Sequence, residues 1–278
     1  MKKLNLEDIQ RVGNEVLLYI KRVCDENHIR YFLASGTALG AKRHSGFIPW
    51  DDDIDIYMLR PDYEKFSSVI DNAKSPFKLL DIYRDDKYFL PFSKMVDTRT
   101  IMDWPIVRNQ YTFGVWVDIF ILDNVPDSDK ECRRFHRKLD LLQRFYTAAL
   151  YKIKPQTFRD KINRLALCWT IPIGPRFFSK RLDRLSQKYN KKSTGRVGQN
   201  SFTAYTRDKE VFSKDYFEKE DLLDFCGVMH PTPYNTHKYL THYYGDYMTL
   251  PPVEKRVSHH TISFYWLNSE GDGTGAEY

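Results

Sequence analysis

Cysteine is scarce in this 278-residue sequence, and long apolar runs are absent. The cysteines lie far apart without a CxxC pair, at Cys24, Cys132, Cys168 and Cys226. This spacing argues against a disulfide framework and against a structural zinc site. No stretch reaches the roughly 18 consecutive apolar residues of a transmembrane helix. The start, MKKLNLEDIQ, lacks the apolar segment of a signal peptide, so we expect a cytoplasmic protein.

Acidic residues are sparse between residues 130 and 196, where nineteen lysines and arginines stand against four aspartates and glutamates. The net charge of +6 therefore combines a segment of +15 with a remainder of −9. Such a division predicts an acidic surface that could hold metal and a basic surface that faces an anionic partner. We expect no nucleic acid, because no binding motif accompanies the charge. Peripheral contact of residues 130–164 with an anionic membrane is one interpretation, and a basic helix packed on the core is the other.

The hydrophobic pattern predicts an α/β (α+β) fold. Helical spacing occurs at residues 7–28, 38–44 and 61–70, and strand-like stretches occur at 30–35, 53–59, 78–83, 92–96 and 115–122. Residues 129 to about 190 are helical in pattern, and the Gly-, Ser- and Lys-containing stretch 191–200 predicts an exposed loop. We therefore divide the chain into a catalytic core (1–128), a basic helical section (129–200), a C-terminal part that completes the site (201–268) and a disordered tail (269–278).

Four aspartates within five residues form the densest chemical signal, in the run Asp51-Asp52-Asp53-Ile54-Asp55. Carboxylates at this density repel one another unless cations neutralise them. Side chains alternate along a strand, so Asp53 and Asp55 should point the same way and converge on Mg²⁺ (or Mn²⁺). Asp118 lies in a very apolar strand, where a carboxylate is costly unless it is paired or metal-bound. If the two strands are neighbours, Asp118 completes a three-carboxylate site; a solvated turn is the alternative for the run alone.

A phosphate-binding turn is the second candidate feature. Ser35-Gly36-Thr37 stands at a predicted strand-to-helix turn, where glycine lets backbone N–H groups approach a phosphate and the helix N-terminus favours negative charge. Arg43 follows within two turns and could complete the neutralisation. Phe47 and Trp50 are candidates for contact with a base or with a quaternary ammonium, and core packing is the other interpretation.

The order of these motifs resembles that of nucleotidyltransferase-fold proteins. SGTALGAKRHSGFIPWDDDIDI (residues 35–56) resembles the signature of the LicD family, to which fukutin and fukutin-related protein are also related. Further stretches match in sequence order: FSKMVD (92–97), GVWVDIFILDNV (114–125) and YGDYMTLPPVEKR (244–256). The resemblance spans roughly residues 30–256 and implies a nucleotidyltransferase-like mixed-sheet core with a basic helical elaboration.

The resemblance also implies an activity and a set of site residues. Bacterial members of the family attach phosphocholine from CDP-choline to teichoic acid, lipopolysaccharide or capsule sugars, and fukutin-type members transfer ribitol phosphate. By this resemblance the metal ligands would be Asp51, Asp53, Asp55 and Asp118, of which Asp53, Asp55 and Asp118 would be catalytic. The donor's phosphates would contact Ser35, Gly36, Thr37, Arg43 and Lys94.

We therefore expect metal-dependent transfer of phosphocholine from CDP-choline to a hydroxyl of a cell-surface glycan or its lipid-linked precursor, with release of CMP. One alternative is a nucleotidyltransferase that releases pyrophosphate. Another is a non-catalytic module that binds glycan or choline. The sequence leaves open the acceptor, the transferred alcohol, the number of metal ions and the role of the pair His259-His260.

Overall fold

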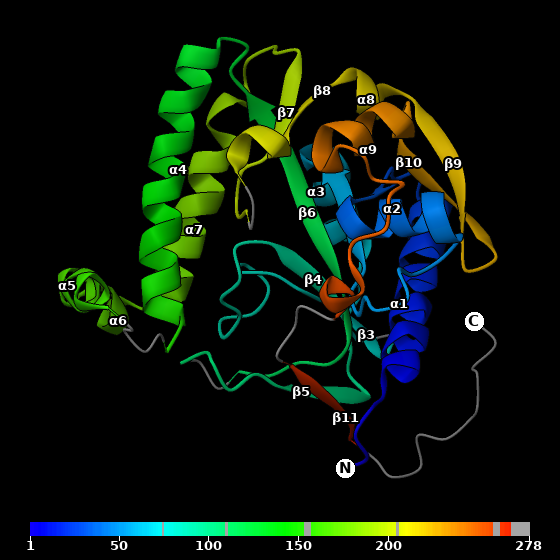
Figure 1. Cartoon of the computed structure of the whole chain (residues 1–278), viewed down its shortest axis with the longest axis horizontal. Coiled ribbons are helices and arrows are strands. Elements are labelled where there is room, and N and C mark those ends of the chain that lie inside the picture. Colours follow the sequence, from blue (N-terminus) through cyan, green and yellow to red (C-terminus); the bar gives the residue numbers. More distant parts are fainter. Residues whose placement is uncertain (74, 109–110, 153–156, 204–205, 258–261, 268–278) are drawn as a thin grey trace.

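The computed structural model describes residues 1–278 except 74, 109–110, 153–156, 204–205, 258–261 and 268–278 (Figure 1). His259-His260 and the expected disordered tail therefore lie outside the described residues. In the described part, helices pack on a seven-stranded mixed sheet, which confirms the α/β (α+β) fold. The sheet strands are β1 (Phe32–Leu33), β2 (Asp55–Leu59), β3 (Phe77–Leu80), β4 (Ser93–Asp97), β6 (Trp116–Val125), β7 (Arg196–Gln199) and β8 (Val211–Ser213).

The strand β6 organises this sheet. It runs parallel to β2 and antiparallel to β4 and β7, with β4 paired to its first half and β7 to its second half. A strand of ten residues is long enough to pair with both β4 and β7 along one edge, because a strand rises about 3.3 Å per residue. β3 and β1 form the outer strands beside β4 and β2, and β8 pairs with β7.

The expectation of an exposed loop at residues 191–200 is wrong for Arg196–Gln199, which form β7. Val197 is only 1% exposed and pairs with Asn124 of β6 and Phe212 of β8. Gly198 and the polar neighbours resemble a turn in sequence, and only pairing with two distant strands makes this segment extended. The division of the chain at residues 128 and 200 stays a prediction, since β7 and β8 add to the sheet that the first 128 residues begin.

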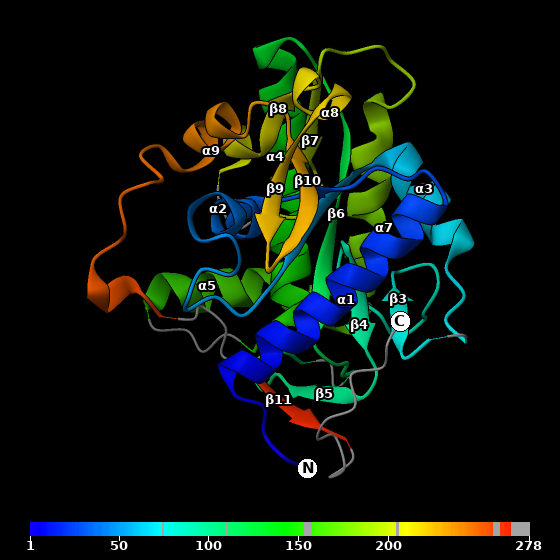
Figure 2. The same cartoon turned by 90° about the vertical axis from the view of Figure 1, so that its right-hand side faces the viewer.

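Four helices flank the centre of the sheet. α1 (Leu6–Glu26) and α3 (Arg60–Val69) lie on one face, and α2 (Ser35–His44) and α9 (Thr236–Tyr244) lie on the other (Figure 2). α1 begins with a reciprocal capping box between Asn5 and Asp8, and α3 has proline in its first turn. The helices expected at residues 7–28 and 61–70 are thus confirmed. α2 begins at Ser35, three residues earlier than expected, so Ser35-Gly36-Thr37 forms its first turn.

The basic section is helical, as expected. It contains α4 (Asp129–Leu150), α5 (Phe158–Leu167), α6 (Thr170–Ile173), α7 (Pro175–Ser186) and the 3₁₀ turn η1 (Gln187–Tyr189). Phe135, Leu139 and Tyr146 of α4 are buried in the core, so its apolar stripe packs against the protein and not against a membrane. No helix among the described residues is long and apolar enough to cross a bilayer.

The sequence pattern did not reveal several small elements that complete the fold. β5 (Thr100–Asp103) pairs with β11 (Ser263–Trp266), which brings the end of the described chain back beside a segment about 160 residues earlier. β9 (Glu220–Phe225) and β10 (Val228–Pro233) form a hairpin beside β1. The remaining elements are short: α8 (Asp215–Glu218), η2 (Arg207–Glu210) and η3 (Val253–Lys255).

Candidate active site

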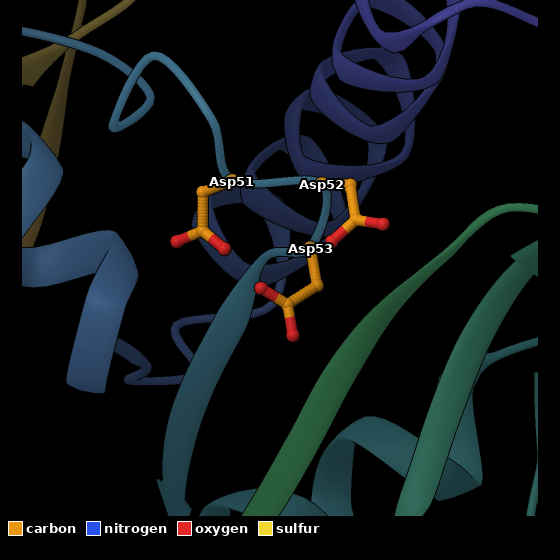
Figure 3. A group of neighbouring side chains, drawn as sticks. All are labelled: Asp51, Asp52 and Asp53. Atoms are coloured by element: carbon orange, nitrogen blue, oxygen red, sulfur yellow. The ribbon is translucent and has the colours of Figure 1, made fainter. Parts of the chain in front are cut away.

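Carboxylates from two parallel strands converge at one point of the sheet. Asp55 of β2 lies opposite Asp118 of β6, and Asp53 lies on the loop that enters β2. Ligand oxygens of Asp53, Asp55 and Asp118 all lie within 4.8 Å of one another. Asp51, Asp52 and Asp53 form a second such group on the same loop (Figure 3). The expected adjacency of the two strands is therefore confirmed, and Asp53 belongs to both groups.

Lys94 and Trp116 hold the Asp118 carboxylate. Lys94 of β4 lies opposite Asp118, so Asp55, Asp118 and Lys94 form a row across three adjacent strands. The Lys94 ammonium forms an ion pair with Oδ1 of Asp118, and the Trp116 indole N–H donates to Oδ2 at 3.1 Å. The ammonium also lies 3.7 Å from the centre of the Trp116 ring. Both partners favour one orientation of the Asp118 carboxylate.

Lys94 is buried, with 4% of its surface exposed. Burial lowers the pKa of Lys94, and Asp118 acts in the opposite direction. Its predicted contact with a donor phosphate stays a prediction, because in this structure its ammonium faces Asp118. Sequence analysis missed Trp116, although residues 116 and 118 of a strand necessarily share a face.

The electrostatics of the cluster suit a divalent cation. Burial, followed by the neighbouring carboxylates Asp53, Asp118 and Asp51, raises the pKa of Asp55 well above its ordinary value. Four carboxylates at such separations repel strongly unless a cation lies among them. The ligand set consists of oxygen atoms, which Mg²⁺ and Mn²⁺ prefer. The residues present therefore fit the expected metal.

The first turn of α2 lies beside the acidic loop. A side chain at Gly36 would come within 3.0 Å of the Asp51 carboxylate, so glycine keeps the space between helix and loop open. The Thr37 hydroxyl accepts a hydrogen bond from the Asp55 N–H at 2.8 Å, which ties α2 to β2. On the other side, the Gln10 amide of α1 donates to the Asp51 carbonyl at 2.8 Å. The loop is thus positioned from both faces of the sheet.

A buried polar network positions Ser35. Its backbone is in the left-handed region (φ 44°), and its N–H donates to the Tyr239 hydroxyl at 2.9 Å. Its side chain hydrogen-bonds with Tyr57 and Tyr243, and Tyr243 donates to Glu210 at 2.6 Å. Burial raises the pKa of Glu210 to about 7. The Ser35 hydroxyl therefore points into the protein, and its predicted donor contact stays a prediction.

Two arginines from distant parts of the sequence, Arg43 and Arg256, interact electrostatically, and Arg256 lies over the Trp50 ring. Arg43 follows Gly36 by seven residues, which places both on one face of α2. Arg43 donates to the Tyr247 carbonyl at 2.7 Å, and burial followed by the nearby Arg256 lowers its pKa. The Arg256 guanidinium lies 5.7 Å from the centre of the Trp50 ring. Since Trp50 directly precedes Asp51, this arginine pair adds positive charge beside the acidic loop.

Phe47 has the packing role that the sequence left open. Its ring lies 5.0 Å from that of Phe225, and it packs against the main core cluster. Trp50 is half-buried beneath Arg256. Of the two aromatic candidates, Trp50 is therefore the one beside charged groups of the site.

Comparison with known proteins decides the family. The lipopolysaccharide cholinephosphotransferase LicD of Haemophilus influenzae is 34% identical over 275 residues, which cover 96% of this chain and 100% of that relative. The chain belongs to the LicD family. The family model described as LicD/FKTN/FKRP, nucleotidyltransferase domain, matches residues 28–138 of this LicD-family chain. Uncharacterised proteins of Rickettsia typhi and Rickettsia prowazekii match shorter stretches, at 37% identity over 26% of the chain and 27% over 45%.

The four LicD-like stretches of the sequence meet around this one site. Residues 35–56 supply α2 and the acidic loop, residues 92–97 supply Lys94, and residues 114–125 supply Trp116 and Asp118. The last stretch supplies Arg256 beside Trp50. The chain is a LicD-type phosphotransferase, and its family motifs form a continuous site although they are separated by up to about 200 residues of sequence.

Proposed function

We propose that this protein transfers phosphocholine from CDP-choline to a hydroxyl of lipopolysaccharide or its lipid-linked glycan precursor. The observation that carries the proposal is the convergence of Asp53, Asp55 and Asp118 beside the open first turn of α2. Phosphoryl transfer needs positioned positive charge around the donor, which this arrangement can gather. The name of the Haemophilus relative supports phosphocholine as the transferred group and lipopolysaccharide as the acceptor.

The proposed reaction exchanges one phosphate ester for another. The acceptor oxygen forms a bond to the distal phosphorus of CDP-choline, and the bond from that phosphorus to the bridging oxygen breaks. CMP leaves with the bridging oxygen, and the proton of the acceptor hydroxyl passes to solvent or to a carboxylate. Phosphocholine remains on the glycan as a phosphodiester.

The residues of the site would have three different roles in this reaction. Asp51, Asp53, Asp55 and Asp118 would hold Mg²⁺ (or Mn²⁺), which when bound neutralises phosphate charge and aligns the attacking and leaving oxygens. The backbone N–H groups of the first turn of α2 would face the diphosphate. Asp118 would orient the acceptor hydroxyl, since Lys94 and Trp116 hold its carboxylate in place.

Arg43 is expected to bind the donor more than to speed the chemistry. Arg43→Ala removes a charged contact to phosphate, which is typically worth 1.5–3 kcal/mol, so KM for CDP-choline should rise about tenfold or more. Steady-state kinetics measure the change. Lys42→Ala is the matched control, because Lys42 is the exposed neighbour on the same helix and should leave KM unchanged. An unaltered KM in Arg43→Ala would remove Arg43 from the donor site.

Product analysis tests the proposed reaction. Purified protein with Mg²⁺ is incubated with CDP-choline, CDP-ribitol or CDP-glycerol, and CMP and pyrophosphate are both quantified. Release of CMP with CDP-choline alone, dependent on acceptor and abolished by chelator, is the expected result. A protein that instead consumes CTP and phosphocholine with release of pyrophosphate is a nucleotidyltransferase. Binding of CDP-choline without turnover on lipopolysaccharide, teichoic acid or capsule glycan would indicate a binding module.

A further inference from the structure

Six large apolar side chains are exposed within a short stretch that runs from α5 through α6 to the start of α7. Their exposed fractions range from 37% to 75%, with Leu165 the most exposed. We call this set the apolar tip: Ile162, Leu165, Trp169, Ile171, Ile173 and Phe177. Single exposed apolar residues are ordinary, but six within residues 162–177 are a concentration typical of an interaction surface.

The apolar tip is fixed to the body of the protein by aromatic packing. The Trp169 ring lies 5.1 Å from Phe145 of α4 and 6.1 Å from Phe178 of α7, both ring centre to ring centre. Trp169 nevertheless keeps 47% of its surface exposed, while Phe178 is buried. In Figure 1, α5 and α6 project from the end of α4. The apolar tip is therefore a protruding surface that is anchored to α4 and α7 through Trp169.

Positive charge lies beside the apolar tip on α7. Phe177, Arg181 and Arg184 recur at helical spacing on α7, and both arginines are exposed. The Arg181 guanidinium lies 5.2 Å from the centre of the Phe177 ring. The one acidic residue of α7, Asp183, points inward and forms an ion pair with Arg60 at 3.0 Å. The exposed face of this helix is therefore apolar at its start and cationic further on.

We infer that the apolar tip docks onto an anionic membrane surface, with Arg181 and Arg184 among the lipid headgroups. A protruding apolar group with a tryptophan and a cationic border fits the boundary between headgroups and acyl chains. A second copy of the chain would bring an identical cationic border against this one, which like-charge repulsion disfavours. The membrane contact thus lies on α5–α7, since the apolar stripe of α4 is already buried.

Docking would bring the enzyme to a lipid-anchored acceptor. This role of the docking rests on the proposed function. In Figure 2, α5 and the orange-red turn η3, which directly precedes Arg256, both lie on the left-hand side of the molecule, whereas in Figure 1 α5 lies at the far left and η3 nearer the centre. Membrane binding itself does not depend on the identity of the donor or acceptor.

Co-sedimentation with lipid vesicles tests the inference on the full chain. Vesicles of phosphatidylcholine alone are compared with vesicles containing equal phosphatidylcholine and phosphatidylglycerol, at low and high salt. The protein should sediment with the anionic vesicles at low salt and much less at high salt. Leu165→Glu/Ile173→Glu should weaken binding at least tenfold without changing the melting temperature, because both side chains are exposed.

The matched control is Leu222→Glu/Met229→Glu on the β9–β10 hairpin, where the side chains are 53% and 50% exposed. It makes the same change of charge and polarity and should bind vesicles like wild type. Equal loss in both double variants, no binding by wild type, or a dimer in light scattering that Leu165→Glu/Ile173→Glu abolishes would each overturn the inference. CMP release with a soluble acceptor reports separately on the proposed chemistry, which the tip variant should retain.

Discussion

Asp55→Asn should lower kcat/KM by about 10³-fold or more and leave the fold intact. The proposed cation contributes several kcal/mol of stabilisation to the charge of the transition state, and each 1.36 kcal/mol corresponds to tenfold in rate. Asp55 lies where both strands of the site meet, so losing its charge should empty the cation position. The measurement is CMP release under saturating Mg²⁺.

The same substitution should stabilise the metal-free protein. Burial and three nearby carboxylates raise the pKa of Asp55, which means that its ionised form is unfavourable in the folded state without a cation. Removing that charge relieves the repulsion, so metal-free Asp55→Asn should melt at a higher temperature than metal-free wild type. Mg²⁺ should raise the melting temperature of wild type and have little effect on the variant.

Asp52→Asn is the control for these two effects. It makes the same change within the same acidic run, but Asp52 lies outside the group formed by Asp53, Asp55 and Asp118. Its activity should remain within a few-fold of wild type. If Asp55→Asn unfolds the protein, or keeps its activity, the acidic cluster has a structural role and the proposed metal-dependent chemistry is wrong.

Gly114→Ala should destabilise the protein by about 3 kcal/mol or more. A methyl group at this position would overlap the Asp97 carbonyl and the Thr100 hydroxyl, and would lie 2.7 Å from the Thr100 carbonyl. These atoms belong to the turn between β4 and β5, which the Asp97 N–H ties to the Val115 carbonyl at 2.8 Å. The backbone therefore has little room to yield. The midpoint of urea unfolding measures the loss.

Gly195→Ala is the matched control for this prediction. Its added methyl group would meet only the Asp127 carboxylate at 3.6 Å, which is an ordinary van der Waals distance. It should change stability by no more than about 1 kcal/mol, since it also restricts the unfolded chain. Similar unfolding midpoints for the two variants would show that the β4–β5 turn can move aside. Loss of activity in folded Gly114→Ala would show that the start of β6 had shifted Asp118.

The grouping of the acidic side chains could be predicted from the sequence because its signals are local. Asp53 and Asp55 share a side through strand alternation, and Asp118 is conspicuous as a carboxylate in an apolar strand. The α2 turn precedes them in the order typical of the family. The partners of these residues were harder to predict. Trp116 follows from the alternation that places it on the same face as Asp118, whereas only the fold brings Arg256 to Trp50.

By itself, the sequence determined which residues carry the charge, where the helices α1, α3 and α4 and the strands β2, β4 and β6 lie, and which family the motifs resemble. Only the tertiary structure decided that Lys94 faces Asp118, that residues 196–199 form a strand, and that α4 buries its apolar stripe while the tip of α5–α7 stays exposed. The reason is physical. The spacing of apolar residues indicates which face of a helix or strand is buried, but strand register and helix packing depend on contacts between residues far apart in the chain.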